Sequence, residues 1–312
     1  MGLRRFFQTL AGNASRSPLA QALLDQLEIL DLSRRVPPLL SPWAELAHSR
    51  HGEAGSRHRG RGLDYDDSRV YQPGDDQRYM DWRLSARSGE LFLKVFREER
   101  RASVFILVDR RAGMRFGTRV RLKVTQAARV ASLYAFNAQS RQAAVAGVML
   151  QSSPHWIEDS FGLDAAFYFA RQAARPAPPC GGVPEPGLAE ILSRLSRVLV
   201  PGTEICLISD FADLDDRCRP LLWQLASEHQ LAAVQVVDPA EVELPSAGPL
   251  RLVAATLGDS VRIDTSDPVT ASRYAAAATT YLDQRQALFT GLNIPYLRLM
   301  TDCDRIEEEI PR

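Results

Sequence analysis

Short apolar runs alternate with longer amphipathic segments from residue 103 onward. Apolar runs rich in β-branched side chains predict buried strands at 103–109, 143–150, 203–210 and 231–238. The segments between them repeat apolar residues every three or four positions, which predicts helices at 121–138, 162–174, 187–199 and 213–229. This alternation predicts an α/β domain with a doubly wound, mostly parallel sheet that carries helices on both faces.

The same patterns place further elements around this core. They predict a strand at 155–159, a hairpin at 250–264, an Ala-rich helix at 268–290 and a last strand at 295–300. Near the N-terminus, residues 18–32 have helical spacing, and Pro37 and Pro38 end that pattern.

The stretch 49–63 is rich in Gly, Arg and His and contains almost nothing to bury, so we expect a flexible surface loop there. Its arginines are either solvated or form a contact surface for an acidic partner, and the candidates for that contact are Arg57, Arg59 and Arg61.

Charge and composition exclude several classes of function. The 38 basic and 38 acidic residues cancel, so no bulk field attracts nucleic acid or a membrane surface. The cysteines at 180, 206, 218 and 303 lack CxxC spacing, which argues against structural zinc and against a disulfide framework. No run approaches about 18 apolar residues. We therefore expect a soluble cytoplasmic protein with no direct membrane insertion.

Three predicted strands end in a carboxylate, at Asp109, Asp210 and Asp238. Ligands of doubly wound sheets gather at the carboxyl ends of the strands, so these positions suit a binding site. An Asp that follows a strand is also a common helix N-cap or turn former. Both roles remain open for each of the three.

The stretch 60–99 carries five linked elements in a fixed order and resembles the bacterial domain of unknown function 58 family. The elements are Gly-x-Gly at Gly60 and Gly62, Arg-x-Tyr-x-Pro-Gly-Asp-Asp at 69–76, Arg-x-x-Asp-Trp at 78–82, Ala86-Arg87, and Lys-x-Phe at 94–96. The sequence FGTRVRLKVTQAARVA after the first buried strand is also similar to the family.

The resemblance implies a von Willebrand factor A-type domain over 102–305 and a β-containing subdomain with the family motif over 35–101. The helical spacing near the N-terminus predicts a helical segment over 1–34 before them. The resemblance also implies a partner, because family members typically accompany a MoxR-type AAA+ ATPase and are thought to act with it as adaptors. It establishes no catalytic activity. Longer members carry N-terminal transmembrane helices, and this chain resembles the short, soluble kind.

A-type domains often bind Mg²⁺ through Asp-x-Ser-x-Ser after the first strand, a Thr from a later loop and an Asp after the fourth strand. Here the first motif starts at Asp109 but has Arg111 and Gly113 at the serine positions, and the loop 173–187 contains no Ser or Thr. Asp210 remains as the last ligand. A hard cation prefers several oxygen ligands and is repelled by a guanidinium, so we expect a degenerate metal site and no cofactor.

The acidic stretch 64–81 has three interpretations. Paired carboxylates can perform acid/base chemistry, which would make the protein a hydrolase. Since each acid has an arginine close by in sequence, we favour a cluster of ion pairs with a structural role. A partner-binding surface is the other alternative. The motif residues are Arg69, Tyr71, Gly74, Asp75, Asp76, Arg78, Asp81, Trp82, Arg87 and Lys94.

The most favoured function is a non-catalytic adaptor that binds a MoxR-type ATPase, and also a client protein, through the strand ends and the Arg-rich loop. A Mg²⁺-dependent protein-binding module is the first alternative. We predict that Arg111 bridges Asp109 and Asp210 in place of an ion, with Arg110 as the other candidate donor and contact residue. We also predict that Trp82 is buried and that residues 60–99 form a compact subdomain joined firmly to the A-type domain.

Overall fold

The computed structural model describes residues 22–36, 64–72, 75–97, 102–176, 184–253 and 260–309. The chain divides into two compact units, of which the first contains residues 1–43 and 102–312 and the second contains residues 44–101.

The first unit is built around a six-stranded sheet with the strand order β10-β7-β6-β3-β4-β5. All neighbours in this sheet are parallel except β5, which is an antiparallel edge strand beside β4. The strands are β3 (Ser103–Asp109), β4 (Ala144–Leu150), β5 (His155–Ser160), β6 (Glu204–Ser209), β7 (Gln230–Val237) and β10 (Tyr296–Met300). This is the doubly wound, mostly parallel arrangement that the alternation of strands and helices predicts.

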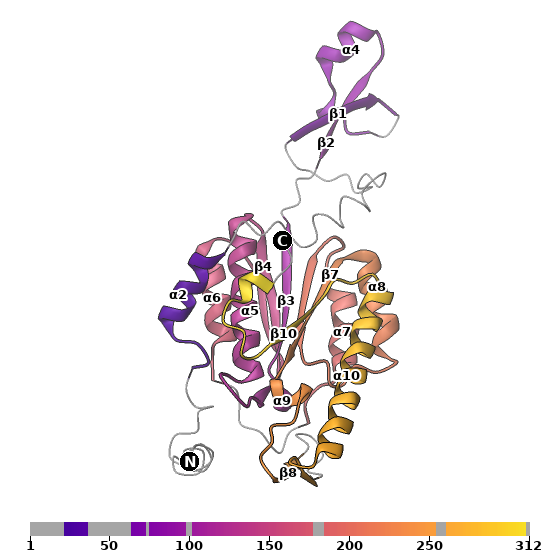
Figure 1. Cartoon of the computed structure of the whole chain (residues 1–312). Coiled ribbons are helices and arrows are strands. Elements are labelled where there is room, and N and C mark those ends of the chain that lie inside the picture. Colours follow the sequence, from indigo (N-terminus) through magenta and orange to yellow (C-terminus); the bar gives the residue numbers. More distant parts are fainter. Residues whose placement is uncertain are drawn as a thin grey trace. The chain divides into compact units, whose positions relative to one another are not determined.

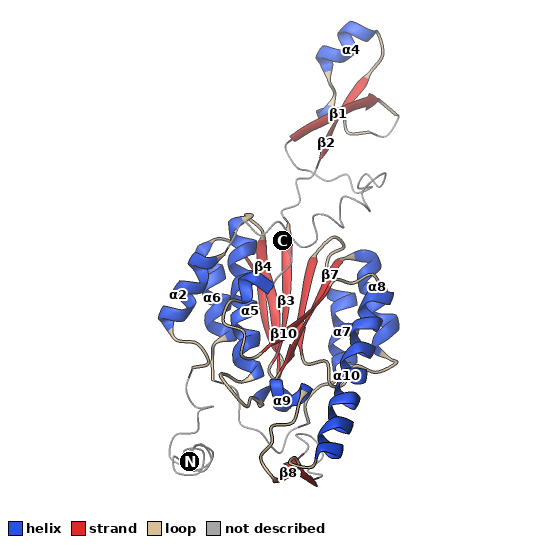
Figure 2. Cartoon of the chain, in the orientation of Figure 1, coloured by secondary structure: helices blue, strands red, loops and turns tan. Residues whose placement is uncertain are grey.

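Helices cover both faces of the sheet, and Figure 2 shows the strands between two helical layers. One layer contains α5 (Lys123–Ser140), α6 (Leu163–Ala173) and α2 (Gln26–Arg35), with the short C-terminal α11 (Ile306–Glu309) at β10. The other contains α7 (Leu188–Val198), α8 (Cys218–Glu228) and α10 (Pro268–Gly291), as Figure 1 shows. Helix α5 is buried along most of its length because it lies between the sheet and α2 and α6.

The predicted elements are present, with shifted boundaries. The helix expected at 213–229 begins only at Cys218, because the residues before it form a turn in which Phe211 has a left-handed φ of 53°. Three short helices of the first unit were not predicted, namely η3 (Ala112–Arg115), α9 (Pro239–Val242) and α11 (Ile306–Glu309). The predicted hairpin is formed by β8 (Pro249–Val253) and β9 (Ser260–Asp264).

The second unit consists of a two-stranded antiparallel sheet and two short helices. Strand β1 (Asp64–Val70) pairs with β2 (Phe92–Arg97), and between them lie η2 (Gln77–Tyr79) and α4 (Trp82–Ser88). Two motif carboxylates start these helices, since Asp76 caps η2 and Asp81 caps α4. Gly89 ends α4 with a left-handed φ of 78°, a conformation that glycine adopts without steric cost.

The prediction that Trp82 is buried is wrong, because 66% of this residue is exposed. Among the described residues of the second unit, the buried apolar side chains are Met80 and Leu93, which form a β-bridge to each other. A two-stranded sheet and a seven-residue helix provide too little surface to cover an indole as well.

Candidate functional site

The ends of the adjacent strands β3 and β6 bring the predicted carboxylates Asp109 and Asp210 to one edge of the sheet. Asp109 is 1% exposed, and its carboxylate accepts hydrogen bonds from the Ser209 hydroxyl at 2.6 Å and from the Arg111 backbone N–H at 3.0 Å. Ser209 is fully buried, so its hydroxyl is not accessible to a substrate. This pair therefore fixes the strand ends instead of presenting a nucleophile.

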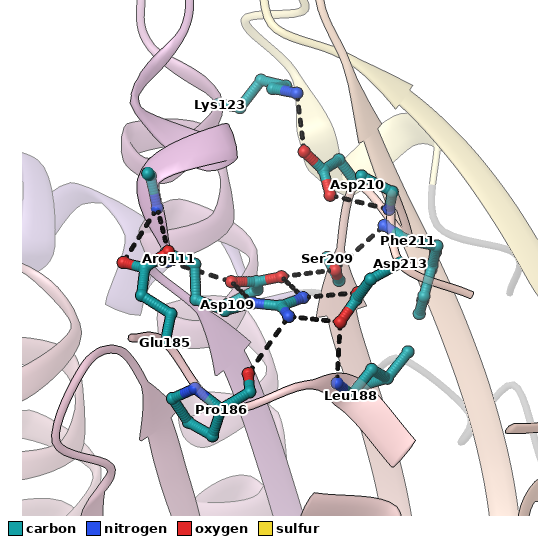
Figure 3. A network of polar contacts seen from close by, with 12 residues as sticks. Asp109, Arg111, Lys123, Glu185, Pro186, Leu188, Ser209, Asp210, Phe211 and Asp213 are labelled. Carbon is teal, nitrogen blue, oxygen red and sulfur yellow. Dashed lines mark hydrogen bonds and ion pairs between the residues drawn. The ribbon is translucent and has the colours of Figure 1, made fainter. Parts of the chain in front are cut away.

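The Arg111 guanidinium lies between two carboxylates (Figure 3). Toward Asp109 its Nε and Nη2 donate at 3.0 and 2.7 Å, and toward Asp213 its Nη1 and Nη2 donate at 2.5 and 2.8 Å. Such paired contacts match the planar shape of guanidinium to that of carboxylate. Arg111 thus joins the turn after β3 to the turn after β6.

A second cation, Lys123 at the start of α5, holds the carboxylate of Asp210. Its Nζ lies 2.8 Å from Asp210 Oδ2 and 2.7 Å from Glu241 Oε1. Lys123 is 2% exposed, so this contact is shielded from water. The structure thus corrects the prediction that Arg111 bridges Asp109 and Asp210: Arg111 bridges Asp109 and Asp213, and Lys123 takes Asp210.

Burial and charge pairing shift the pKa values of these groups in opposite directions. Burial raises the pKa of Asp213, but the hydrogen bonds and charge of Arg111 outweigh it and hold that pKa below its ordinary value. Burial likewise lowers the pKa of Lys123, yet the charges of Asp210 and Glu241 outweigh it and raise that pKa. The carboxylate of Asp213 and the ammonium group of Lys123 therefore stay charged at neutral pH.

Asp238 caps a helix, which is one of the two roles predicted for it from the sequence. It is fully buried, starts α9 through a capping box with Glu241, and accepts hydrogen bonds from the backbone N–H and the hydroxyl of Thr118. The Thr301 hydroxyl donates to the same carboxylate at 2.8 Å. Asp238 thus ties the ends of β7 and β10 to the loop before α5.

Sequence comparison decides the family. The family described as "Protein of unknown function DUF58" matches residues 67–284. The chain belongs to the DUF58 family. Two relatives, "Uncharacterized protein Rv1480" of Mycobacterium tuberculosis and "Uncharacterized protein Mb1516" of Mycobacterium bovis, are 30% identical to this chain over 259 residues, which cover 81% of this chain and 80% of each relative.

Two solved structures are similar in outline. BatB from Bacteroides thetaiotaomicron has a TM-score of 0.41 and 11% identity, covering 67% of this chain and 95% of that chain. An aerotolerance-related membrane protein from Bacteroides fragilis has a TM-score of 0.40 and 13% identity, covering 67% of this chain and 96% of that chain. Both TM-scores are below 0.5, so the assignment to DUF58 rests on the sequence matches. In the described part of this chain, no helix is long and apolar enough to cross a membrane.

The side chains at the ends of β3 and β6 do not fit a magnesium ion. Both serine positions lack a hydroxyl, and the Arg111 guanidinium lies against the carboxylate of Asp109. A Cβ added at Gly113 would lie 3.1 Å from Asp210 Oδ2, so the position faces the site but offers no ligand. Within the described ranges, no group of three or more His, Cys, Asp or Glu side chains is placed to hold a metal.

The candidate contact residue Arg110 is buried. It is 3% exposed, and its guanidinium donates to the carbonyls of Gln172, Arg175 and Pro176, at the end of α6. Burial, together with nearby Arg115 and Arg175, lowers its pKa to about 10. The other candidates, Arg57, Arg59 and Arg61, lie outside the described residues, as does Gly74 of the motif.

The described residues of the family motif between Arg69 and Lys94 form helix caps and local ion pairs. Arg69 donates to Asp75 at 2.5 Å, and Arg78 forms a forked contact with the helix-capping Asp76. Asp81 accepts from the Leu84 backbone N–H and lies near Lys94. Within the motif, Tyr71 is half-buried and Arg87 is exposed.

Four residues of the site at the strand ends were not predicted from sequence: Lys123, Glu185, Asp213 and Glu241. Lys123 lies inside the stretch that resembles the family, and this was a usable signal because the predicted site already contained two carboxylates. Asp213 comes about one helical turn after Asp210 in the sequence. It was predicted to lie inside a helix, so its position in the loop before Cys218 was not recognised. Glu185 lies in a loop that carries no distinctive pattern, and Glu241 lies in the short helix α9, which was not predicted.

Proposed function

We propose that this DUF58 chain is a non-catalytic protein-interaction adaptor that works with a MoxR-type AAA+ ATPase in the cytoplasm. Its role would be the assembly or maturation of client proteins. The observation that carries this proposal is the position of Arg111, which neutralises Asp109 and Asp213 together. The strand-end edge is thereby held in one shape without a metal, which suits a surface that recognises a protein.

Catalysis by the acidic stretch is less well supported. The carboxylates of Asp75, Asp76 and Asp81 already accept hydrogen bonds from arginines or from helix N-termini. Such carboxylates have low basicity, because hydrogen bonds to the charged form stabilise it. A hydrolase would instead need at least one carboxylate whose pKa lies near the working pH.

The test is a binding measurement between this chain and a purified MoxR-type AAA+ ATPase from the same organism. We expect saturable binding by biolayer interferometry, unchanged when EDTA replaces Mg²⁺ in the nucleotide-free state. Complete loss of binding in EDTA would support a metal-dependent module instead. Absence of binding under both conditions would contradict the adaptor role with this ATPase.

A further inference from the structure

One side of helix α4 faces solvent and presents an indole together with two guanidinium groups. Trp82, Arg83 and Arg87 are all exposed, and they occupy a continuous arc of the helix, because Arg87 follows Arg83 by one turn and Trp82 adjoins Arg83. The opposite side packs on β2, where the hydroxyl of the buried Ser85 accepts a hydrogen bond from the Phe92 N–H at 2.8 Å. We call Trp82, Arg83 and Arg87 the exposed face of α4.

The two arginines of the exposed face are not neutralised by an ion pair. Helix α4 contains no acidic residue, and among the described residues no carboxylate pairs with Arg83 or Arg87. The carboxylate of Asp81, just before the helix, is used as its N-cap. Arg78 is a contrast in the same unit, since its exposed guanidinium pairs with Asp76 at 2.8 Å. The exposed face of α4 therefore carries two positive charges that are available to an anion.

Further apolar surface lies near this face. Val70 and Leu91 are also exposed, and backbone hydrogen bonds hold their segments beside the start of α4. The Tyr71 N–H donates to the Leu91 carbonyl at 2.8 Å, and the residue before Trp82 donates its N–H to the Phe92 carbonyl at 2.8 Å. Exposed apolar side chains that gather in one small unit mark an interaction site, and Trp and Arg are the side chains that most often anchor protein interfaces.

The same observations separate two classes of partner. An indole beside arginines also suits single-stranded nucleic acid, in which bases stack on aromatic rings. Nucleic acid, however, binds through a row of cations that pair with successive phosphates, and the chain has a formal net charge of zero. Two free guanidinium groups beside a large apolar side chain match a protein segment that mixes carboxylates with apolar residues.

We infer that the exposed face of α4 binds an acidic segment of a partner protein. Carboxylates of that segment pair with Arg83 and Arg87, and an apolar side chain packs on Trp82. This inference rests on the proposed adaptor function, because it adds a second contact surface to the strand-end edge. Ion pairs on an exposed helix contribute little each, so the contact is weak by itself and gains strength when other surfaces bind the same partner.

The test is a titration of the isotope-labelled full-length chain with a short synthetic peptide of glutamate and leucine, followed by ¹H–¹⁵N spectra at constant ionic strength. The chain has four tryptophans, and the indole N–H signal that is missing from Trp82→Ala belongs to Trp82. We expect this signal to shift saturably at about millimolar peptide. The apparent affinity should fall about fivefold in Arg83→Gln/Arg87→Gln, and a peptide with glutamine in place of glutamate should cause no shift.

The internal control is Trp223 in α8, which is 64% exposed and thus matches Trp82 in exposure. The exposed carboxylates of Asp216 and Glu228 lie before it and after it in sequence, so its surroundings do not favour an acidic peptide. Its indole signal should stay in place throughout the titration. The spectrum also reports whether each variant is folded.

Four results would overturn the inference: a Trp82 signal that ignores the acidic peptide, an equal shift of the Trp223 signal, unchanged affinity in the double arginine variant, or tighter binding of oligothymidylate than of the peptide. The last result would assign the face to nucleic acid. A Trp82 signal that moves on dilution of the chain alone would also contradict the inference, because a second copy would then cover the face. Binding of the MoxR-type ATPase is measured separately, so failure of the adaptor role is distinguishable from failure of this surface.

Discussion

Arg111 lies between the carboxylates of Asp109 and Asp213, and Lys123 lies between those of Asp210 and Glu241. A buried guanidinium loses its hydration, and this loss is offset only where hydrogen-bond geometry is good on every side. Arg111 meets that condition through its paired contacts with Asp109 and Asp213. Removing it would leave the buried carboxylate of Asp109 without its cation.

We therefore expect Arg111→Ser to lower the free energy of unfolding by about 3 to 5 kcal/mol. Urea unfolding at neutral pH measures this change. The matched control is Arg217→Ser, because Arg217 pairs with Asp215 in the same turn region while its side chain is 81% exposed. The control should leave the urea midpoint nearly unchanged. Equal midpoints for the two variants would contradict the structural role of Arg111.

His229 offers a test at the same scale through pH. It is 5% exposed, neither ring nitrogen has a hydrogen-bond partner among the described residues, and burial lowers the pKa of its imidazole. The imidazole therefore binds a proton more readily in the unfolded chain than in the folded chain. Its contribution to the free energy of unfolding is present above the unfolded pKa of about 6.5 and is lost as the pH falls below that value.

We expect the urea midpoint of the parent to decrease as the pH is lowered from about 7.5 to about 5.5. The decrease should be smaller in His229→Leu. The comparison of the two pH dependences removes any constant effect of the substitution. An identical fall in both proteins would show that His229 is not the titrating group.

At the scale of elements, the loop 116–122 connects η3 to α5 and fixes the start of α5 through contacts with distant parts of the chain. Thr118 bonds to Asp238, Arg121 donates to the carbonyls of Thr301 and Cys303, and Lys123 follows the loop directly. The loop is also tightly folded, since a Cβ added at Gly117 would lie 2.4 Å from the Arg121 carbonyl oxygen. A side chain there would displace the backbone that places Lys123.

We expect Gly117→Ala to lower the free energy of unfolding by about 1 to 3 kcal/mol, because the added methyl group cannot fit without a backbone shift. Gly291→Ala is the control, since nothing lies within 4 Å of a Cβ at that helical position. Thermal unfolding followed by circular dichroism compares the two. A control that is destabilised as much as Gly117→Ala would contradict the close approach in the loop.

The second unit gives a prediction about its own small core. Met80 is 7% exposed and Trp82 is 66% exposed, so only Met80 should support the unit. We expect Met80→Ala to raise deuterium uptake in β1 and β2, with a loss of about 2 kcal/mol or more of local stability. Trp82→Ala should leave that uptake unchanged. Increased uptake in Trp82→Ala would show that the indole has a packing role.

At the scale of the whole molecule, the fold was more predictable than the site. Strands β3, β6 and β7 are mostly apolar, and such runs signal burial on both faces of a sheet without reference to distant residues. The pairing of Arg111 with Asp109 joins positions two apart and follows from the local sequence. The pairing of Lys123 with Asp210 joins positions 87 apart, so it depends on the three-dimensional placement of α5.

The exposure of Trp82 could not be predicted for a related reason. Residue type favours burial of an indole, but burial requires enough neighbouring surface, and the size of the second unit's core is a property of its fold. The same holds for the turn 210–217, where helical spacing extended the predicted helix over residues that instead place Asp213 against Arg111.

The central claim is that Arg111 and Lys123, and not a metal ion, hold the carboxylates at the strand ends. Calorimetric titration of the parent chain with Mg²⁺ tests it most directly, with Arg111→Ser/Gly113→Ser as the comparison because it restores both hydroxyl positions. We expect only heats of dilution from the parent up to several millimolar Mg²⁺, and weak saturable binding by the double variant. Saturable binding of Mg²⁺ by the parent at sub-millimolar concentration would contradict the account.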